Sequence, residues 1–185
     1  MRIIRGKYGR RRFQIPASFN ARPTTDFAKE NLFNVLENLV DWEKSDALDL
    51  FAGTGSIAFE MLSRGCRSVT AVELNYKHAL FIEKVAKELR SEELVLIRGD
   101  ALRYLSSGAK PSFGLIFADP PYDLPELPEL PNLVLNGGLL LEGGIFVLEH
   151  SKNHHFEAFS YFTQRRIYGS VNFSIFVKEA ARKDA

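Results

Sequence analysis

The sequence predicts an α/β fold in which a mainly parallel sheet is covered by helices on both faces. Short apolar runs alternate with amphipathic stretches along most of the 185 residues, as is typical of strand–helix–strand units with right-handed crossovers. A glycine turn follows the first apolar run, and acidic residues follow several of the others. Ligands bind at the carboxyl ends of the strands in such sheets. We therefore expect a binding site there.

The elements are expected in a regular order along the chain. A helix begins near Asp26, where Thr24 or Thr25 can cap it and apolar residues recur on one face. Strands are expected over residues 47–51, 67–73, 94–98, 113–118 and 144–150, followed by an antiparallel pair over 165–169 and 170–179. Further helices are expected over 57–65 and 76–90, around Leu102 to Leu105, and, more weakly, over 132–141.

Length and composition predict one compact domain over residues 1–185, with a basic extension (1–23), a core (24–178) and a frayed tail (179–185). The single cysteine, Cys66, excludes an internal disulfide, and the four histidines lack ligand spacing, so no metal site is expected. No apolar run approaches the roughly 20 residues that span a bilayer, and no secretory signal follows the basic start. We expect a cytoplasmic monomer without membrane insertion.

Charge is unevenly distributed between the first 22 residues and the rest. The segment holds seven of the 24 basic residues and no acid, which leaves 17 bases against 23 acids elsewhere. Such a basic arm favours a phosphate-bearing partner, and the alternative is a solvated, floppy terminus. Apolar residues between the bases favour short strands that present arginines over a pure tail.

The turn "DLFAGTGSIA" places Gly53 and Gly55 after the first strand, and Ala58 completes a G-x-G-x-x-A pattern. Glycine lets a backbone turn tightly or approach a ligand closely. Glu73 lies 20 residues beyond Gly53, at the end of the second strand, where a carboxylate can accept both ribose hydroxyl hydrogens. The pattern fits a dinucleotide or any other adenosine-containing cofactor, and a structural turn is the alternative.

Two further acids have a structural alternative as well as a ligand role. Asp100, after the third strand, can meet an adenine amino group or cap the helix that follows. Asp49 can contact the cofactor or hold the glycine loop through backbone N–H groups.

The stretch "DPPY" follows the fourth strand and stiffens the backbone there, because each proline fixes φ and removes a donor. Asp119 and the Pro120 carbonyl can accept the two N–H groups of an exocyclic amine on a nucleobase. The nitrogen lone pair is then directed toward an electrophile, and positioning rather than a strong base promotes the reaction. Tyr122 can stack on the base. The alternative is a rigid turn with Tyr122 as a core aromatic.

These motifs resemble the class I S-adenosylmethionine-dependent methyltransferases that modify amino groups of nucleobases, through "DLFAGTG", "AVE", "GDAL" and "DPPY". More narrowly, "MRIIRGKYGRRRF", "ARPTTDFAKENLFNVL", "LSRG", "GGIFVLEHS" and "RIYG" resemble the RsmD family, bacterial enzymes that methylate guanine N2 in 16S ribosomal RNA. The resemblance runs from Met1 to about Val177.

The resemblance implies a Rossmann-like seven-stranded sheet, mainly parallel, that binds S-adenosylmethionine over the glycine turn and meets 16S RNA, within a small-subunit particle, through the basic extension. The implied catalytic residues are Asp119, Pro120, Pro121 and Tyr122. The implied cofactor residues are Asp49, Gly53, Thr54, Gly55, Glu73, Asp100 and Ala101. The implied RNA-binding residues are Arg10, Arg11, Arg12, Arg22 and Thr25.

Three other functions fit part of the pattern. An adenine-N6 methyltransferase of DNA or RNA would use "DPPY" in the same way, because the motif orients any exocyclic amine. A non-catalytic RNA-binding protein would need no acids at positions 73, 100 and 119. A nicotinamide-dependent oxidoreductase fits the glycine turn, but the sequence has no Tyr-x-x-x-Lys pattern and "DPPY" would have no role in it.

Overall fold

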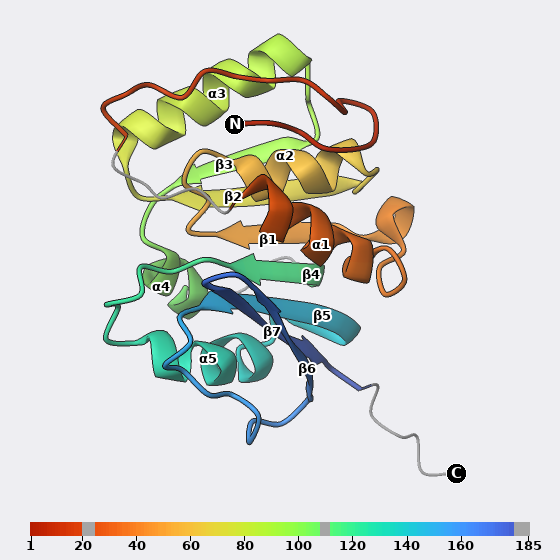
Figure 1. The fold of residues 1–185 in the computed structure, drawn as a ribbon, viewed down its shortest axis with the longest axis vertical. Helices are drawn as coiled ribbons and strands as arrows, with labels where there is room; N and C mark the ends of the chain where they lie inside the picture. Colours follow the sequence, from red (N-terminus) through yellow and green to blue (C-terminus); the bar gives the residue numbers. More distant parts are fainter. Residues whose placement is uncertain (20–24, 108–111, 180–185) are drawn as a thin grey trace.

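A seven-stranded sheet forms the centre of the molecule (Figure 1). The computed structural model describes residues 1–19, 25–107 and 112–179. The strand order is β3-β2-β1-β4-β5-β7-β6, in which the first five are parallel and β7 runs antiparallel to both β5 and β6. The predicted fold class and the terminal antiparallel pair are confirmed.

The strands are β1 (Asp46–Leu50), β2 (Ser68–Glu73), β3 (Leu94–Arg98), β4 (Phe113–Ala118), β5 (Leu140–His150), β6 (Phe162–Tyr168) and β7 (Val171–Val177). The helices are α1 (Asp26–Leu36), α2 (Ser56–Ser63), α3 (Tyr76–Leu89), α4 (Ala101–Ser106) and α5 (Leu130–Asn136), with 3-10 turns η1 (Trp42–Lys44) and η2 (Leu127–Glu129).

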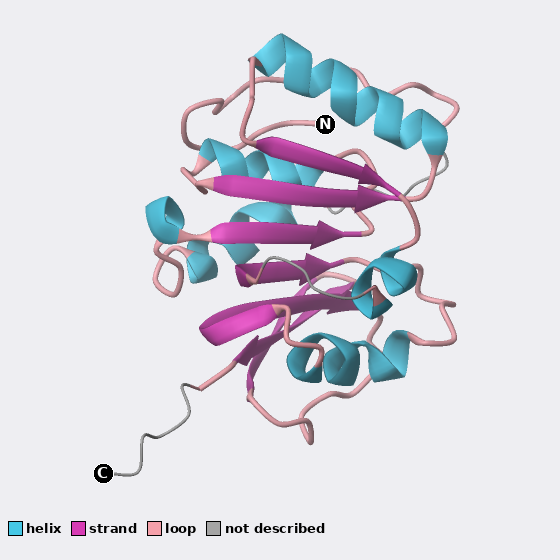
Figure 2. Ribbon diagram, turned by 180° about the vertical axis from the view of Figure 1, so that it is seen from behind, coloured by secondary structure: helices cyan, strands magenta, loops and turns pink. Residues whose placement is uncertain are grey.

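Alternate residues along the central strands face two separate apolar cores. Ala47 belongs to the core beneath α1, α2 and α3, whereas Leu48 belongs to the core beneath α4 and α5. Figures 1 and 2 show α1 and α2 on the opposite side of the sheet from α4 and α5. Because both faces are covered, the inner strands β1, β2 and β4 are almost entirely buried, whereas the edge strands β3 and β6 and the first part of β5 have exposed positions.

The weak helix expected over 132–141 is wrong in its position. The structure has η2 and then α5, which ends at Asn136, and β5 begins at Leu140 rather than at residue 144. Pro131 is tolerated because it lies in the first helical turn. Gly137 and Gly138, the second with φ of 73°, end the helix and redirect the chain into the strand.

The basic extension is folded onto the domain as a hairpin-like loop, not as a floppy tail. Backbone hydrogen bonds join Ile3 to residues 10 and 11 and Met1 to Phe13, but they form only an isolated bridge between Arg2 and Arg12, so the expected short strands are not complete. Gly6 and Arg10 both have positive φ, and the turn between the two arms leaves few residues for pairing. Ile3, Tyr8 and Phe13 join the core beneath α1 to α3.

Buried polar side chains of α1 and α2 attach this loop to the domain. Lys29 is fully buried, and its ammonium donates to the Arg2 carbonyl and to Ser56 Oγ at 2.9 Å. Glu60, also fully buried, accepts from the backbone N–H of Ile4 at 2.7 Å and of Arg5 at 3.2 Å. A buried charge needs such partners to offset lost hydration, so these contacts fix the start of the chain.

Within the described ranges, no helix is both long and apolar enough to cross a membrane.

Candidate active site

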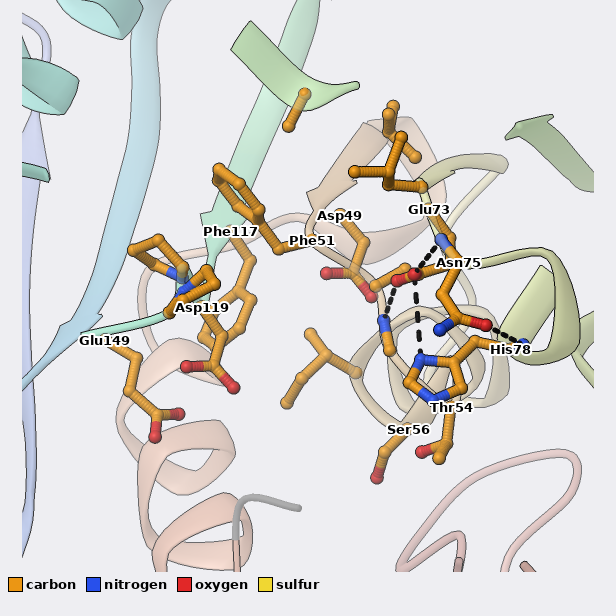
Figure 3. A pocket seen from close by; sticks show the side chains of 18 of the residues that line it. Asp49, Phe51, Thr54, Ser56, Glu73, Asn75, His78, Phe117, Asp119 and Glu149 are labelled. Carbon is orange, nitrogen blue, oxygen red and sulfur yellow. Dashed lines mark hydrogen bonds and ion pairs between the residues drawn. The ribbon is translucent and has the colours of Figure 1, made fainter. Parts of the chain in front are cut away.

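A cavity of about 800 Å³ opens at the carboxyl ends of β1, β2 and β4 (Figure 3). Its size lies in the range of roughly 300–1,000 Å³ that is usual for small-molecule sites. Its walls include these residues predicted from the sequence: Asp49, Gly53, Thr54, Glu73, Asp100, Ala101, Asp119, Pro120, Pro121, Tyr122 and Thr25. The topology therefore brings residues from across 98 positions of the chain to one edge of the sheet, as strands of this fold class require.

The glycine turn is shaped by a left-handed backbone conformation at three alternate residues. Phe51, Gly53 and Gly55 all have positive φ, of 63°, 56° and 75°. A Cβ at Gly55 would lie 2.9 Å from the Phe59 ring, so this glycine permits close packing behind the turn. Gly55 is not among the residues that line the cavity, unlike Gly53. Its predicted cofactor contact stays a prediction, while its packing role is observed.

Glu73 fastens the glycine turn to the end of β2. Its Oε2 accepts from the Gly53 N–H at 2.6 Å and its Oε1 from the Asn75 N–H at 2.7 Å, and His78 Nδ1 lies 3.6 Å from Oε1 (Figure 3). A carboxylate has about four lone-pair positions on its two oxygens. The two backbone donors thus orient Glu73 and leave acceptor capacity for hydroxyl groups of a ligand.

Asp49 supports the helix that follows the turn. It is 1% exposed, and its Oδ2 accepts from the Ala58 N–H in the first turns of α2 at 2.9 Å. Burial raises the pKa of Asp49 to about 8, and the nearby charge of Glu73 adds to this effect, whereas the Ala58 N–H opposes it. Of its two predicted roles, holding the loop is the one that the contacts display.

Asp100 caps α4, because its Oδ1 accepts from the Arg103 N–H at 2.8 Å. It also lines the cavity together with Ala101, so the capping role and a ligand contact are compatible. Thr25 likewise has two roles. Its hydroxyl caps α1 by accepting from the Ala28 N–H at 3.2 Å, and it contributes to the cavity wall.

Strand register places four site positions in one row. Val72, Leu50, Ala118 and Leu148 are paired across β2, β1, β4 and β5. The residues that follow these four in the chain are Glu73, Phe51, Asp119 and Glu149, respectively. Neighbouring strands lie about 4.8 Å apart, so Glu73 and Asp119 belong to strands about 10 Å apart and Asp119 and Glu149 to adjacent strands.

The D-P-P-Y segment leaves the end of β4 and turns beside the end of β5. The Asp119 N–H donates to the Leu50 carbonyl at 3.4 Å, and the Leu124 N–H donates to the Pro121 carbonyl at 3.0 Å, which closes the turn. Tyr122 is 41% exposed, so the alternative of a core aromatic is wrong. Its hydroxyl donates to Glu149 Oε1 at 3.2 Å, which connects the segment to the neighbouring strand.

Sequence reasoning missed several residues of the cavity. Glu149 lies near the end of β5 and is 4% exposed, and Ser170 and Val171 enter from the hairpin between β6 and β7. An acid at the end of an apolar strand was the available signal for Glu149, the same signal that identified Glu73. Ser170 and Val171 offered no such signal, because their position depends on the antiparallel direction of β7.

In the described part of the chain, no group of three or more His, Cys, Asp or Glu residues is arranged to hold a metal ion.

His150 has a structural role in the part of the sheet beside the cavity. It follows Glu149 on β5 and points to the opposite face, where its ring is fully buried against Phe156. Its ring nitrogens lie 2.9 Å from Ser174 Oγ and 2.8 Å from the Ser151 carbonyl. Burial lowers the pKa of His150 to about 4, so the ring is neutral at physiological pH.

One of the predicted RNA-binding arginines, Arg11, lies away from the cavity mouth. Arg11 pairs with Glu88 near the end of α3 at 3.0 Å, whereas His78 at the start of α3 lines the cavity. Ten residues of helix separate these positions, or about 15 Å at 1.5 Å per residue. Arg10 and Arg12 are exposed in the same loop, and Arg22 lies outside the described residues.

Known proteins resemble this chain over nearly its whole length. Residues 1–177 match the family model described as Conserved hypothetical protein 95. The chain belongs to this family. The resemblance to RsmD enzymes is thereby confirmed.

Several curated relatives, two of which are described here, carry the name "Ribosomal RNA small subunit methyltransferase D". The protein of Haemophilus influenzae is 33% identical over 156 residues, which cover 83% of this chain and 80% of the relative. The protein of Escherichia coli K12 is 30% identical over 149 residues, which cover 80% and 74%. Among solved structures, the yhhF protein of Escherichia coli superposes with a TM-score of 0.85 at 27% identity and covers 98% of this chain and 99% of its own.

Proposed function

We propose that this protein transfers a methyl group from S-adenosylmethionine to the exocyclic N2 amine of a guanine in 16S ribosomal RNA. As a member of a methyltransferase family whose relatives are named for ribosomal RNA of the small subunit, it is an S-adenosylmethionine-dependent enzyme of ribosomal RNA. The observation that carries the finer proposal is that the D-P-P-Y segment and the Glu73 glycine turn line one cavity.

The cavity fits S-adenosylmethionine on the chemistry of its walls. Glu73 retains acceptor capacity for the ribose hydroxyls, and Asp100 with Ala101 forms the wall beyond β3 where the adenine would lie. A Cβ added at Gly53 would meet nothing closer than 3.9 Å, so the turn leaves open space at the ligand side. When bound, S-adenosylmethionine supplies an electrophilic methyl group on a positively charged sulfur.

The chain's own part in the reaction is to orient the amine. Asp119 and the Pro120 carbonyl each accept a hydrogen bond from one N–H of the amine. This arrangement directs the nitrogen lone pair into the cavity. The amine becomes acidic as its nitrogen is alkylated, so acceptors placed where positive charge develops assist the reaction without a strong base. Pro120 and Pro121 fix the backbone φ and thereby reduce the motion of these acceptors. Tyr122, 41% exposed beside them, provides a stacking surface for the base.

The position of the arginine loop (residues 10–12) supports an RNA acceptor that extends beyond the target nucleotide. An acceptor that contacts both the cavity and Arg11 must extend about 15 Å along α3. The 16S RNA of a small-subunit particle provides such a length of chain. We propose that a monomer binds this particle, with Thr25 at the cavity mouth.

Comparison of methyl acceptors tests the proposal. Purified protein with labelled S-adenosylmethionine is expected to methylate small-subunit particles or 16S RNA, and mass spectrometry of RNA from cells lacking the protein should show one missing methyl on a guanine N2. Duplex DNA as the best acceptor, or a methyl on adenine N6, would instead favour an adenine-N6 enzyme. Absence of detectable heat in calorimetry with millimolar S-adenosylmethionine would favour a non-catalytic RNA-binding protein.

A further inference from the structure

Glu149 is a buried carboxylate in the wall of the cavity. It has no role in orienting the amine or in binding the cofactor as proposed so far. It is 4% exposed near the end of β5, and the Tyr122 hydroxyl donates to its Oε1 at 3.2 Å. Burial of a carboxylate is costly and is expected only where the group has a structural or ligand-binding task. Figure 3 shows the side chains of Asp119 and Glu149 on the same side of the cavity.

The register of β4 and β5 places Glu149 next to the amine acceptor. Ala118 pairs with Leu148, so Asp119 and Glu149 follow equivalent positions on adjacent parallel strands, about 4.8 Å apart. Both side chains extend to the face beneath α1 to α3, because each lies two residues beyond a residue of that core, Phe117 and Val147. Two neighbouring acceptors therefore face the place where the target base would lie.

Guanine is the base whose donors match two adjacent acceptors. Its N2 amine and its N1–H lie side by side on one edge of the ring. Adenine presents an amine next to N1, which carries a lone pair and no hydrogen. A carboxylate cannot accept a hydrogen bond from this N1, and the two lone pairs repel each other. The difference between the two purines is thus greatest at the atom beside the amine.

We propose that Glu149 selects guanine by accepting a hydrogen bond from N1–H while Asp119 accepts from the N2 amine. This inference rests on the proposed guanine-N2 activity. The Tyr122 hydroxyl donates to Glu149 Oε1 and so helps to fix the direction of the carboxylate. A site built around a buried acceptor rejects a ligand that lacks the donor, because the acceptor then stays unpaired.

The test compares two acceptors that differ at N1. Small subunits are assembled on unmethylated 16S RNA whose target guanine is left in place or replaced by 2-aminopurine, which keeps the 2-amino group but has a lone pair at N1. The native protein is expected to favour guanine by on the order of 10- to 100-fold in kcat/KM. In Glu149→Gln, whose amide can donate to a bare N1, that preference should fall at least about tenfold, with a lower kcat/KM on guanine.

Matched variants keep the outcome decisive. Glu142→Gln makes the same change at an exposed position of β5 and should retain the native preference. Glu149→Asp keeps an acceptor and should lower kcat/KM on guanine while it still disfavours 2-aminopurine, and calorimetry with S-adenosylhomocysteine shows that each variant is folded.

Equal losses on both acceptors in Glu149→Gln, or a native protein indifferent to 2-aminopurine, would overturn the role of Glu149 and leave the guanine-N2 activity standing. A native protein that methylates no guanine acceptor overturns both proposals.

Discussion

Asp49 offers a direct test of how burial controls the charge beneath the glycine turn. The pKa of its carboxyl is about 8 in the folded protein against an ordinary value of 3.8. Because the folded pKa is raised, the folded chain holds a proton that the unfolded chain releases between pH 3.8 and 8. Its contribution to stability is therefore greatest below pH 3.8 and declines as the pH rises toward 8.

The size of this effect follows from the pKa difference. Each pKa unit corresponds to about 1.4 kcal/mol, so the full difference corresponds to about 6 kcal/mol. Asp49→Asn keeps an acceptor for the Ala58 N–H but does not titrate. Relative to the native protein, the variant is expected to gain several kcal/mol in free energy of unfolding between pH 4 and pH 8.

Urea unfolding at half-unit pH steps measures this difference. Asp46→Asn is the matched control, because Asp46 lies on the same strand and hydrogen bonding to Arg67 lowers its pKa instead. That variant should lose stability relative to the native protein as the pH rises through 4. If the difference between Asp49→Asn and the native protein does not change with pH, burial does not control the charge of Asp49.

Three further outcomes are expected. Asp119→Ala should lower kcat by on the order of 100-fold or more and change the dissociation constant of S-adenosylhomocysteine little, and equal losses in both would make it a cofactor residue. Exchange of the arginines at positions 10–12 for Glu should weaken RNA binding and reduce the slope of log K against log salt by about two to three, whereas an unchanged slope would remove this loop from the interface. His150, whose pKa is lowered to about 4 from 6.5, should contribute about 3 kcal/mol above pH 6.5 that is lost as the pH falls toward 4. His150→Gln should lack this loss in acid unfolding, and an unaltered pH profile would contradict the assignment.

The sequence was sufficient to predict the residues whose position depends only on the local strand and the turn after it. Glu73, Asp100 and Asp119 each lie at or just beyond the end of a strand of a parallel sheet, and parallel strands end at one edge. The alternation of apolar runs and amphipathic stretches likewise predicted nearly every strand. Local sequence therefore determines the fold and the centre of the site.

Features that depend on long-range packing were not predictable from the sequence. The arginine loop lies near Glu88 because buried Lys29 and Glu60 hold the backbone of Arg2 and Ile4, a contact between segments far apart in the chain. The start of β5 was misplaced because two glycines end α5 early, and glycine in a loop or at a helix end looks alike in sequence.

Glu73, Phe51, Asp119 and Glu149 form a row in which the spacing between neighbouring positions equals the spacing between strands. A point mutation does not change this spacing. Backbone hydrogen bonds fix each step at about 4.8 Å, so a different reach between cofactor and acceptor requires a longer or shorter side chain on an unmoved strand. Asp119→Glu advances a carboxylate by one methylene, on the order of 1.3 Å. An enzyme with this sheet can thus adapt to a new acceptor through longer or shorter side chains at the strand ends, while the backbone of the sheet does not change.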